Sequence, residues 1–204
     1  MASKIYLASR SPRRRELLKQ IGVAFEMLLL RERPPRGPDV DEAPLSGETP
    51  RDYVARVCRL KADLGWERVL QRQLPRHPVL AADTAVCLED TILGKPADRA
   101  DAARMLGLLS GREHRVLTAV ALKFEGRTEL AVSETAVCFR ALSQADVQQY
   151  VHSGEPLDKA GAYAIQGRAA AFVSDLHGSY SGVMGLPLYE TALLIEKFRS
   201  GAFA

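Results

Sequence analysis

Two hydrophobic spacings follow one another along this chain, and together they predict an alternation of helices and strands. Leu17, Leu18 and Ile21 recur at the spacing of one helix face, after a serine–proline pair, and Gly22 ends the pattern. The segment 78–83 is a short apolar run that ends at a carboxylate, which is typical of a buried strand. Because such patterns alternate along the chain, they favour an α/β or α+β fold.

The same patterns place the remaining elements. Helices are predicted from Thr49-Pro50 to Gly65, over 98–109, over 143–153 and from Pro187 onward, and strands over 24–31, 116–124 and 128–140. Ser143 with Asp146 resembles a capping box, and Glu125-Gly126 turns the last two strands into an antiparallel hairpin. The proline- and acid-rich segment 33–48 is predicted to be a loop. It is too short to separate autonomous domains, so we expect one domain over residues 1–204.

Composition narrows the class of protein. With 204 residues, of which 47% are hydrophobic and 26% charged, the chain is an ordinary globular sequence, long enough for one substantial core or two small lobes. Its net charge of +3 suits an anionic small molecule. We expect no nucleic-acid partner, because the chain has no long run of Lys and Arg and no interleaving of basic with aromatic residues.

Cysteine usage and apolar runs indicate the compartment. Cys58, Cys87 and Cys138 lie far apart in apolar surroundings and form no Cys-x-x-Cys pair, which predicts buried free thiols in a reducing compartment. No apolar run approaches the length of a membrane span, and the N-terminus lacks a cleavable leader pattern. These features predict a cytoplasmic protein with no membrane partner.

The start of the chain carries the strongest candidate site. An apolar strand over 4–8 leads into the turn Ser9-Arg-Ser-Pro-Arg-Arg-Arg15 and then directly into a helix. Ser11 is a good N-cap, and Pro12 fits the first helical position. The free N–H groups of a helix N-terminus, two hydroxyls and several guanidinium groups together favour a polyanion such as a phosphate chain. The same stretch also fits a capped surface helix with solvated arginines.

Acidic residues at element ends form further candidates. Asp39, Asp41 and Glu42 in the proline-rich loop carry oxygen ligands for a hard cation, although the stretch equally fits a solvated acidic loop. Asp83 follows the predicted strand directly, where a carboxylate can collect a metal or orient a water, or can cap the following turn.

Two glycine-bearing segments complete the polar clusters. Lys95 stands between glycine and proline in a rigid turn that suits a phosphate contact or a solvated lysine, and the P-loop spacing is absent. The glycine-rich segments 158–167 and 179–187 allow close backbone approach or form structural turns beside the core. Within the first, Tyr163 and Gln166 can stack on and hydrogen-bond a planar base. The histidines share no metal-ligand spacing, and a serine triad is not expected because no Gly-x-Ser-x-Gly elbow is present.

Taken in order, these pieces resemble the Maf family of nucleoside triphosphate pyrophosphatases. The matching motifs are Ser9-Arg-Ser-Pro-Arg-Arg14, Val40-Asp-Glu42, Lys61-Ala62, Ala82-Asp-Thr84, Gly94-Lys-Pro96, Ser110-Gly111, Asp158-Lys-Ala-Gly161, Ile165-Gln-Gly167 and Val183-Met-Gly-Leu-Pro187. One tripeptide would be weak, but this many pieces in order span nearly the whole chain and are specific. The uninterrupted Ser-Pro-Arg-Arg, the Ala-Asp-Thr and the Ile-Gln-Gly resemble the dTTP/UTP branch rather than the 7-methyl-GTP branch.

The resemblance implies both a fold and a reaction. The implied fold is an elongated mixed sheet with flanking helices and a central cleft between two lobes, similar to that of inosine triphosphate pyrophosphatases. The implied reaction converts a nucleoside triphosphate to the monophosphate plus pyrophosphate with a divalent metal, Mg²⁺ or Mn²⁺. The family's proton acceptor falls on Asp83, its substrate-selecting positions fall on Arg13, Thr84 and Gln166, and Glu42, Lys61 and Lys95 match further charged positions. A homodimer is also implied.

These residues suggest a division of labour. We expect Ser9, Ser11, Arg13 and Arg14 to hold the phosphate chain, with Lys61 and Lys95 adding positive charge. We expect Glu42 and Asp83 to hold the metal, Asp83 to accept the proton of the attacking water, and Gln166 with Thr84 to contact the base.

Three alternatives remain at this stage. The first is a pyrophosphatase for modified or purine triphosphates. The second is a nucleotide-binding regulator of cell division in which hydrolysis is incidental. The third is a basic nucleic-acid-binding domain, against which the mild charge and the missing aromatic platform argue.

Overall fold

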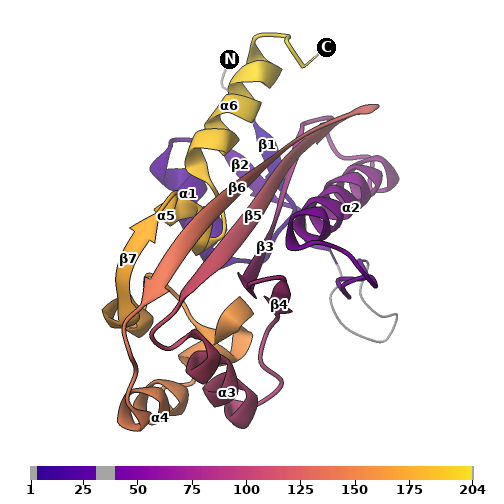
Figure 1. Cartoon of the computed structure of the whole chain (residues 1–204). Coiled ribbons are helices and arrows are strands. Elements are labelled where there is room, and N and C mark those ends of the chain that lie inside the picture. Colours follow the sequence, from indigo (N-terminus) through magenta and orange to yellow (C-terminus); the bar gives the residue numbers. More distant parts are fainter. Residues whose placement is uncertain (1–3, 31–39, 204) are drawn as a thin grey trace.

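One mixed sheet of seven strands forms the centre of the computed structural model, which describes residues 4–30 and 40–203 (Figure 1). The strands run in the order β2-β1-β3-β5-β6-β7, and β4 pairs with β3 off this path. Their bounds are β1 Ile5–Leu7, β2 Phe25–Met27, β3 Val79–Leu88, β4 Thr91–Leu93, β5 Glu113–Phe124, β6 Arg127–Phe139 and β7 Val173–His177. Parallel pairs link β1 to β2 and β3, and the other pairs are antiparallel. The predicted α/β class is confirmed.

Six α-helices and three short 3₁₀-helices flank the sheet in the described part of the chain. The α-helices are α1 Pro12–Gln20, α2 Pro50–Gln71, α3 Arg99–Leu109, α4 Gln144–His152, α5 Tyr180–Met184 and α6 Leu188–Arg199, and the 3₁₀-helices are η1 Glu155–Asp158, η2 Ala160–Ala162 and η3 Arg168–Phe172. Ser11 and Thr49 cap α1 and α2 as predicted, and Ser143 with Asp146 forms the predicted capping box of α4.

Several predicted bounds are wrong. Gly65 does not end α2 but lies inside it, at the contact of the helix with β3. A Cβ at this position would lie 2.7 Å from Val79 Cγ1, so the glycine allows α2 to pack closely on β3. The predicted strand 24–31 shrinks to β2, and β4, β7 and α5 were not predicted because they are only three to five residues long. Cys58 and Cys87 are buried free thiols as expected, whereas Cys138 is only partly buried.

The predicted strand over 78–83 is longer than expected, and this changes the surroundings of the carboxylate of Asp83. Asp83 does not follow the strand; it lies in the middle of β3, which continues to Leu88. The polar pair Asp83 and Thr84 interrupts the apolar pattern but not the ladder, since Asp83 pairs with Ala119 and Thr84 with Thr118 on β5. Backbone pairing, which the side-chain pattern does not report, sets the end of the strand.

The hydrophobic core is divided into an upper and a lower part. One cluster lies between α2 and one face of the sheet, and a second lies on the opposite face beneath α1 and α6 (Figure 1). A third cluster surrounds the lower end of the sheet with α3, α4 and the 3₁₀-helices. Strand β3 contributes to all three clusters, so it connects the two parts of the core.

One edge of β3 is left open between these two parts. β1 pairs with Val79 and Leu80, and β4 pairs with the same edge only from Val86 to Leu88, while β5 occupies the other edge. Within the described residues no strand therefore pairs with 81–85 on this side. Asp83 and Thr84 point to opposite faces of β3, because side chains alternate along a strand. The open edge lies beside both residues and leaves room for a polar partner on each face.

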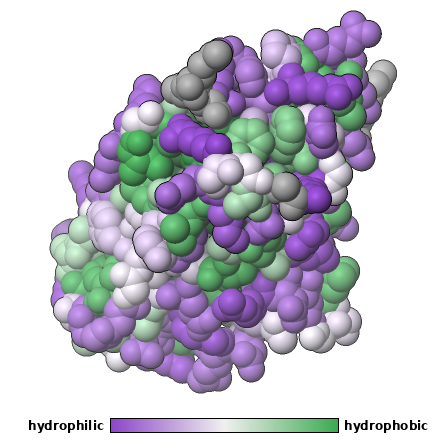
Figure 2. Space-filling model, turned by 90° about the horizontal axis from the view of Figure 1, so that it is seen from above, coloured by the Kyte–Doolittle hydropathy of each residue, from purple (hydrophilic) through white to green (hydrophobic). Residues whose placement is uncertain are grey.

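The surface carries charged and apolar side chains side by side. Seen from above, hydrophobic residues reach the surface between hydrophilic ones (Figure 2). Among the described residues, no helix combines the length and the apolar character that a membrane span requires.

A buried histidine gives the lower core a pH-dependent stability. His114 Nε2 lies 2.9 Å from the Tyr163 hydroxyl, and its ring packs edge-on against Tyr163 and Phe139. Burial lowers the pKa of His114 from 6.5 to about 4. Between these two pH values the ring is therefore neutral in the folded protein and protonated in the unfolded chain.

We therefore expect stability to fall as the pH drops from 6.5 towards 4, by roughly 3 kcal/mol from this group alone. His114→Phe should flatten this part of the profile in urea unfolding measured at several pH values. His152→Gln, at an exposed position, should leave the profile unchanged. An equally steep profile in His114→Phe would contradict the assignment.

Candidate active site

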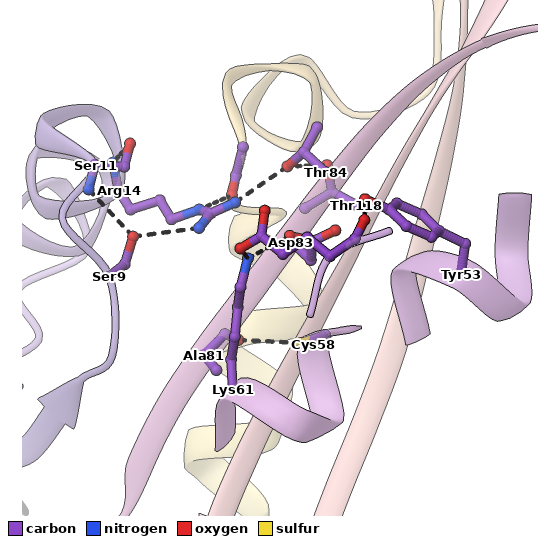
Figure 3. A network of polar contacts seen from close by, with 12 residues as sticks. Ser9, Ser11, Arg14, Tyr53, Cys58, Lys61, Ala81, Asp83, Thr84 and Thr118 are labelled. Carbon is purple, nitrogen blue, oxygen red and sulfur yellow. Dashed lines mark hydrogen bonds and ion pairs between the residues drawn. The ribbon is translucent and has the colours of Figure 1, made fainter. Parts of the chain in front are cut away.

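A partly buried arginine lies at the open edge of β3. The Arg14 Nε donates to the Gly185 carbonyl at 2.7 Å, Nη1 to Ser9 Oγ at 3.2 Å and Nη2 to Thr84 Oγ1 at 3.3 Å (Figure 3). Burial lowers the pKa of Arg14, and the neighbouring Asp83 carboxylate opposes that shift. Three acceptors from three separate segments thus hold one guanidinium in a fixed orientation.

The segment after α5 approaches this arginine through a glycine. Gly185 has φ of +112°, a conformation that favours glycine, and it ends α5. A Cβ at this position would lie 3.6 Å from both Arg14 Nε and Thr84 Oγ1. The glycine-rich segment 179–187 therefore forms part of the site through its backbone carbonyl.

Lys61 on α2 lies between two carboxylates on the other side of the opening. Its Nζ is 2.7 Å from Asp83 Oδ1 and 2.7 Å from Glu42 Oε1. Burial by itself lowers the pKa of Lys61, but the two carboxylates outweigh it and raise the pKa. For Glu42, burial raises the pKa, and the charge and hydrogen bond of Lys61 outweigh it, so its pKa falls.

Asp83 is the most strongly buried of these charged groups. Its side chain is 9% exposed, against 45% for Glu42. Burial raises the pKa of Asp83, although Lys61 and Arg14 pull it down. Its second oxygen, Oδ2, is buried and has no hydrogen-bond partner within the described residues. A buried carboxylate oxygen without a donor is costly, so this atom fits a bound water or cation.

The acid set around Lys61 is sparse. No group of three or more His, Cys, Asp or Glu side chains able to hold a metal lies within residues 4–30 and 40–203. Glu42 and Asp83 are the two carboxylates that come together, and such a pair suits Mg²⁺, which keeps most of its own waters. Asp39 of the predicted acidic cluster lies outside the described residues.

Arg13 has different acidic neighbours from Arg14. Burial lowers its pKa, and Asp158, Tyr150 and Glu155 oppose that shift, which puts Arg13 within electrostatic reach of α4 and η1. Arg13 and Arg14 are neighbours on α1, yet the acidic groups that act on Arg13 include Asp158 and Glu155 of η1, whereas Asp83 and Glu42 act on Arg14.

The same acidic and tyrosine residues hold the turn that carries Gln166. The Tyr150 hydroxyl donates to Glu155 Oε1 at 2.9 Å and accepts from the Ala164 N–H at 3.1 Å, while the Arg168 N–H donates to Glu155 Oε2 at 3.3 Å. Gln166 is exposed within this turn. Tyr163, by contrast, is 5% exposed inside the lower core, so the expectation that it stacks on a base is wrong.

The remaining predicted residues lie near the Arg14 contacts and near the carboxylates that contact Lys61. Ser11 caps α1, and its N–H donates to Ser9 Oγ at 3.2 Å, so the serine pair shapes the turn before the helix. Lys95 is exposed after β4, and its charge helps to lower the pKa of Glu42. The geometry thus brings Ser9, Arg14, Lys61, Asp83 and Thr84 together, with Glu42 and Lys95 beside them and Arg13 and Gln166 towards the lower part.

Two residues of the site were not predicted. The Tyr53 hydroxyl donates to the Glu42 carbonyl at 3.0 Å and ties the acidic segment to α2. Thr118 on β5 lies 3.0 Å from Thr84 Oγ1 and is buried. A signal for Thr118 was present, since it is a polar residue on the inward side of an apolar strand, but its partner is 34 positions away in the chain.

The contact of Lys61 with Asp83 should contribute strongly to stability. Lys61→Met leaves a buried carboxylate without its cation, for which we expect a cost of about 3 kcal/mol in the free energy of unfolding. Lowering the pH should shrink this cost, because a protonated Asp83 needs no cation. Urea unfolding at two pH values measures both effects.

Lys123 provides a matched control for this substitution. Its side chain is 15% exposed, like that of Lys61, and it contacts Asp63 at 2.9 Å, but Asp63 is 39% exposed. Lys123→Met should therefore cost no more than about 1 kcal/mol. Equal losses in the two variants would show that burial of Asp83 does not set the effect.

Comparison with known proteins gives the family. The family model described as "Maf-like protein" matches residues 4–198. A dTTP/UTP pyrophosphatase of Nitrosomonas europaea is 58% identical over 95% of this chain and 93% of that protein, and one of Aromatoleum aromaticum is 56% identical over 96% of each. Among solved structures, the Staphylococcus aureus Ham1 protein superposes with a TM-score of 0.42 at 15% identity, over 67% of this chain and 71% of that one. With its site assembled from the motifs of the N-terminal turn, β3 and the glycine-rich segments, this chain belongs to the Maf-like protein family.

Proposed function

We propose that this protein hydrolyses nucleoside triphosphates, dTTP and UTP above all, to the monophosphate and pyrophosphate. The observation that carries the proposal is the meeting of Asp83, Lys61 and Arg14 at the open edge of β3, where one carboxylate oxygen has no donor among residues 4–30 and 40–203. The substrate choice is supported by relatives named dTTP/UTP pyrophosphatase at 53–58% identity.

Positive charge at the opening suits a triphosphate. The N-terminal turn, with Ser9 and Ser11, stands before the N-terminus of α1, and Arg14 retains donors beyond those it uses inside the protein. In this proposal these groups bind the phosphate chain, Arg13 contacts it from the side of η1, and Lys95 adds charge for the departing pyrophosphate.

Asp83 suits the role of proton acceptor. A general base works best when its pKa approaches the working pH, and burial raises the pKa of Asp83 in that direction. Lys61 keeps the group ionised and oriented through its contact with Oδ1, which leaves Oδ2 for a water. The pKa that governs the acid limb of the pH–activity profile should therefore lie above the ordinary pKa of an aspartate.

Glu42 and Asp83 would hold the divalent cation, Mg²⁺ or Mn²⁺. Both carboxylates contact Lys61, and Oδ2 of Asp83, which has no partner in the part of the chain that the structure describes, is the atom that a cation or its water would satisfy. When bound, the ion lowers the pKa of a coordinated water and screens the phosphate charge.

Base selection is proposed for Gln166 and Thr84. A primary amide offers a donor and an acceptor together, which the edge of uracil or thymine complements. Losing a paired polar group discriminates more strongly than losing a methyl contact, so Gln166 should dominate base choice. We also propose the cytoplasmic location that the cysteine usage and the apolar runs predicted, and the homodimer that the family resemblance implied.

A pyrophosphate-release assay with Mg²⁺ over a panel of nucleotides tests the function. We expect base-selective turnover of dTTP and UTP, loss of turnover with EDTA, and a fall in kcat of about 100-fold or more in Asp83→Asn, with nucleotide binding retained. Near-normal turnover in Asp83→Asn would exclude it as the base. Preferred hydrolysis of purine or modified triphosphates supports the first alternative, and tight binding without turnover supports the cell-division regulator.

Gln166→Glu tests the basis of selection. The substitution replaces the amide donor by an oxygen at the rim of the site, so we expect kcat/KM for UTP and dTTP to fall about tenfold relative to purine triphosphates. Gln149→Glu, which makes the same change at an exposed position of α4, should leave the ratio unchanged. A constant ratio in both variants would remove Gln166 from base selection.

A further inference from the structure

Behind the candidate site, Thr118 connects two of its parts. Its side chain is 1% exposed, and it pairs with Thr84 in the β3–β5 ladder. Its Oγ1 lies 2.8 Å from the Gly182 carbonyl. It also lies 3.0 Å from Thr84 Oγ1, and Thr84 Oγ1 in turn lies 3.3 Å from Arg14 Nη2 (Figure 3). These contacts link α5, both strands and Arg14.

The proton count fixes the direction of this chain of contacts. A hydroxyl carries one proton, and a carbonyl oxygen can only accept. Thr118 Oγ1 donates to the Gly182 carbonyl at 2.8 Å and to Thr84 Oγ1 at 3.0 Å, so these two acceptors share its one proton. Thr84 Oγ1 therefore accepts from both Thr118 and the Arg14 guanidinium, and its own proton is left for a partner on the side of the site.

From this we infer that Thr118 is a positioning residue for the proposed reaction: it donates to Thr84 Oγ1 from the protein interior, so that Thr84 holds Arg14 through its other lone pair and meets the substrate as a hydrogen-bond donor. The inference rests on the proposed function. It adds the chemistry of one contact, since the substrate group that faces Thr84 must be an acceptor, such as a carbonyl or phosphate oxygen.

A second buried threonine provides a matched control. Thr135 on β6 is also 1% exposed, and its hydroxyl accepts from the Ser179 N–H at 2.9 Å and lies 3.4 Å from the Ser179 carbonyl. It therefore anchors the start of the same segment that Thr118 anchors at Gly182. Within the described residues Thr135 makes no hydrogen bond to Thr84 or Arg14, so Thr135→Val loosens the segment without breaking the Thr118–Thr84–Arg14 contacts.

The test compares Thr118→Val, Thr118→Ser and Thr135→Val in the pyrophosphate-release assay with dTTP and UTP. We expect kcat/KM to fall about tenfold in Thr118→Val, to recover in Thr118→Ser, which restores the hydroxyl, and to change less than about twofold in Thr135→Val. In a Thr84→Val background, where the chain is already broken, Thr118→Val should have less than about a twofold effect.

A second measurement is independent of turnover. The Arg14 Nε–H bonded to Gly185 should exchange with solvent at least about tenfold faster, by NMR, in Thr118→Val than in Thr135→Val. Equal effects of the two variants on activity and exchange, or an undiminished effect of Thr118→Val in the Thr84→Val background, would overturn the inference. If the unmodified protein releases no pyrophosphate, the proposed function fails, and the exchange rates still decide whether Thr118 positions Arg14.

Discussion

The need to satisfy the partly buried guanidinium of Arg14 organises this protein. Arg14 lies where β3 has no neighbouring strand, and its donors reach Ser9 before α1, Thr84 on β3 and the Gly185 carbonyl after α5. A buried charge without partners would be unfavourable, so these segments must come together for the fold to be stable. The hydrogen bonds that keep Arg14 in place also fix the edges of the candidate site.

On the opposite face of β3, a second set of charges is arranged differently. Lys61 contacts two carboxylates, and one oxygen of the more buried carboxylate has no partner among the described residues. Arg14 has its hydrogen bonds within the protein, whereas the Asp83 carboxylate is left incomplete. A group that the fold leaves unsatisfied is a natural place for a substrate, a water or a cation to bind.

The gap in the sheet explains how these two sets can act on one molecule. Adjacent residues of a strand point to opposite faces, and a continuous sheet would separate Asp83 from Thr84. Because β1 and β4 pair with different parts of the same edge of β3, the residues between them are reachable from both faces. The lower part of the core then adds Arg13 and the turn of Gln166, which Tyr150 and Glu155 hold.

The sequence by itself determined the local features: the caps at Ser11 and Thr49, the β5–β6 hairpin and the motifs that indicate the family. Each depends on residues within a few positions of one another, or on their order. Only the tertiary structure decided that Asp83 lies inside a strand, that Gly65 lies inside a helix, and that Thr118 stands behind Thr84. Those outcomes depend on backbone pairing and close packing between segments far apart in the chain, and neither leaves a periodic trace in the sequence.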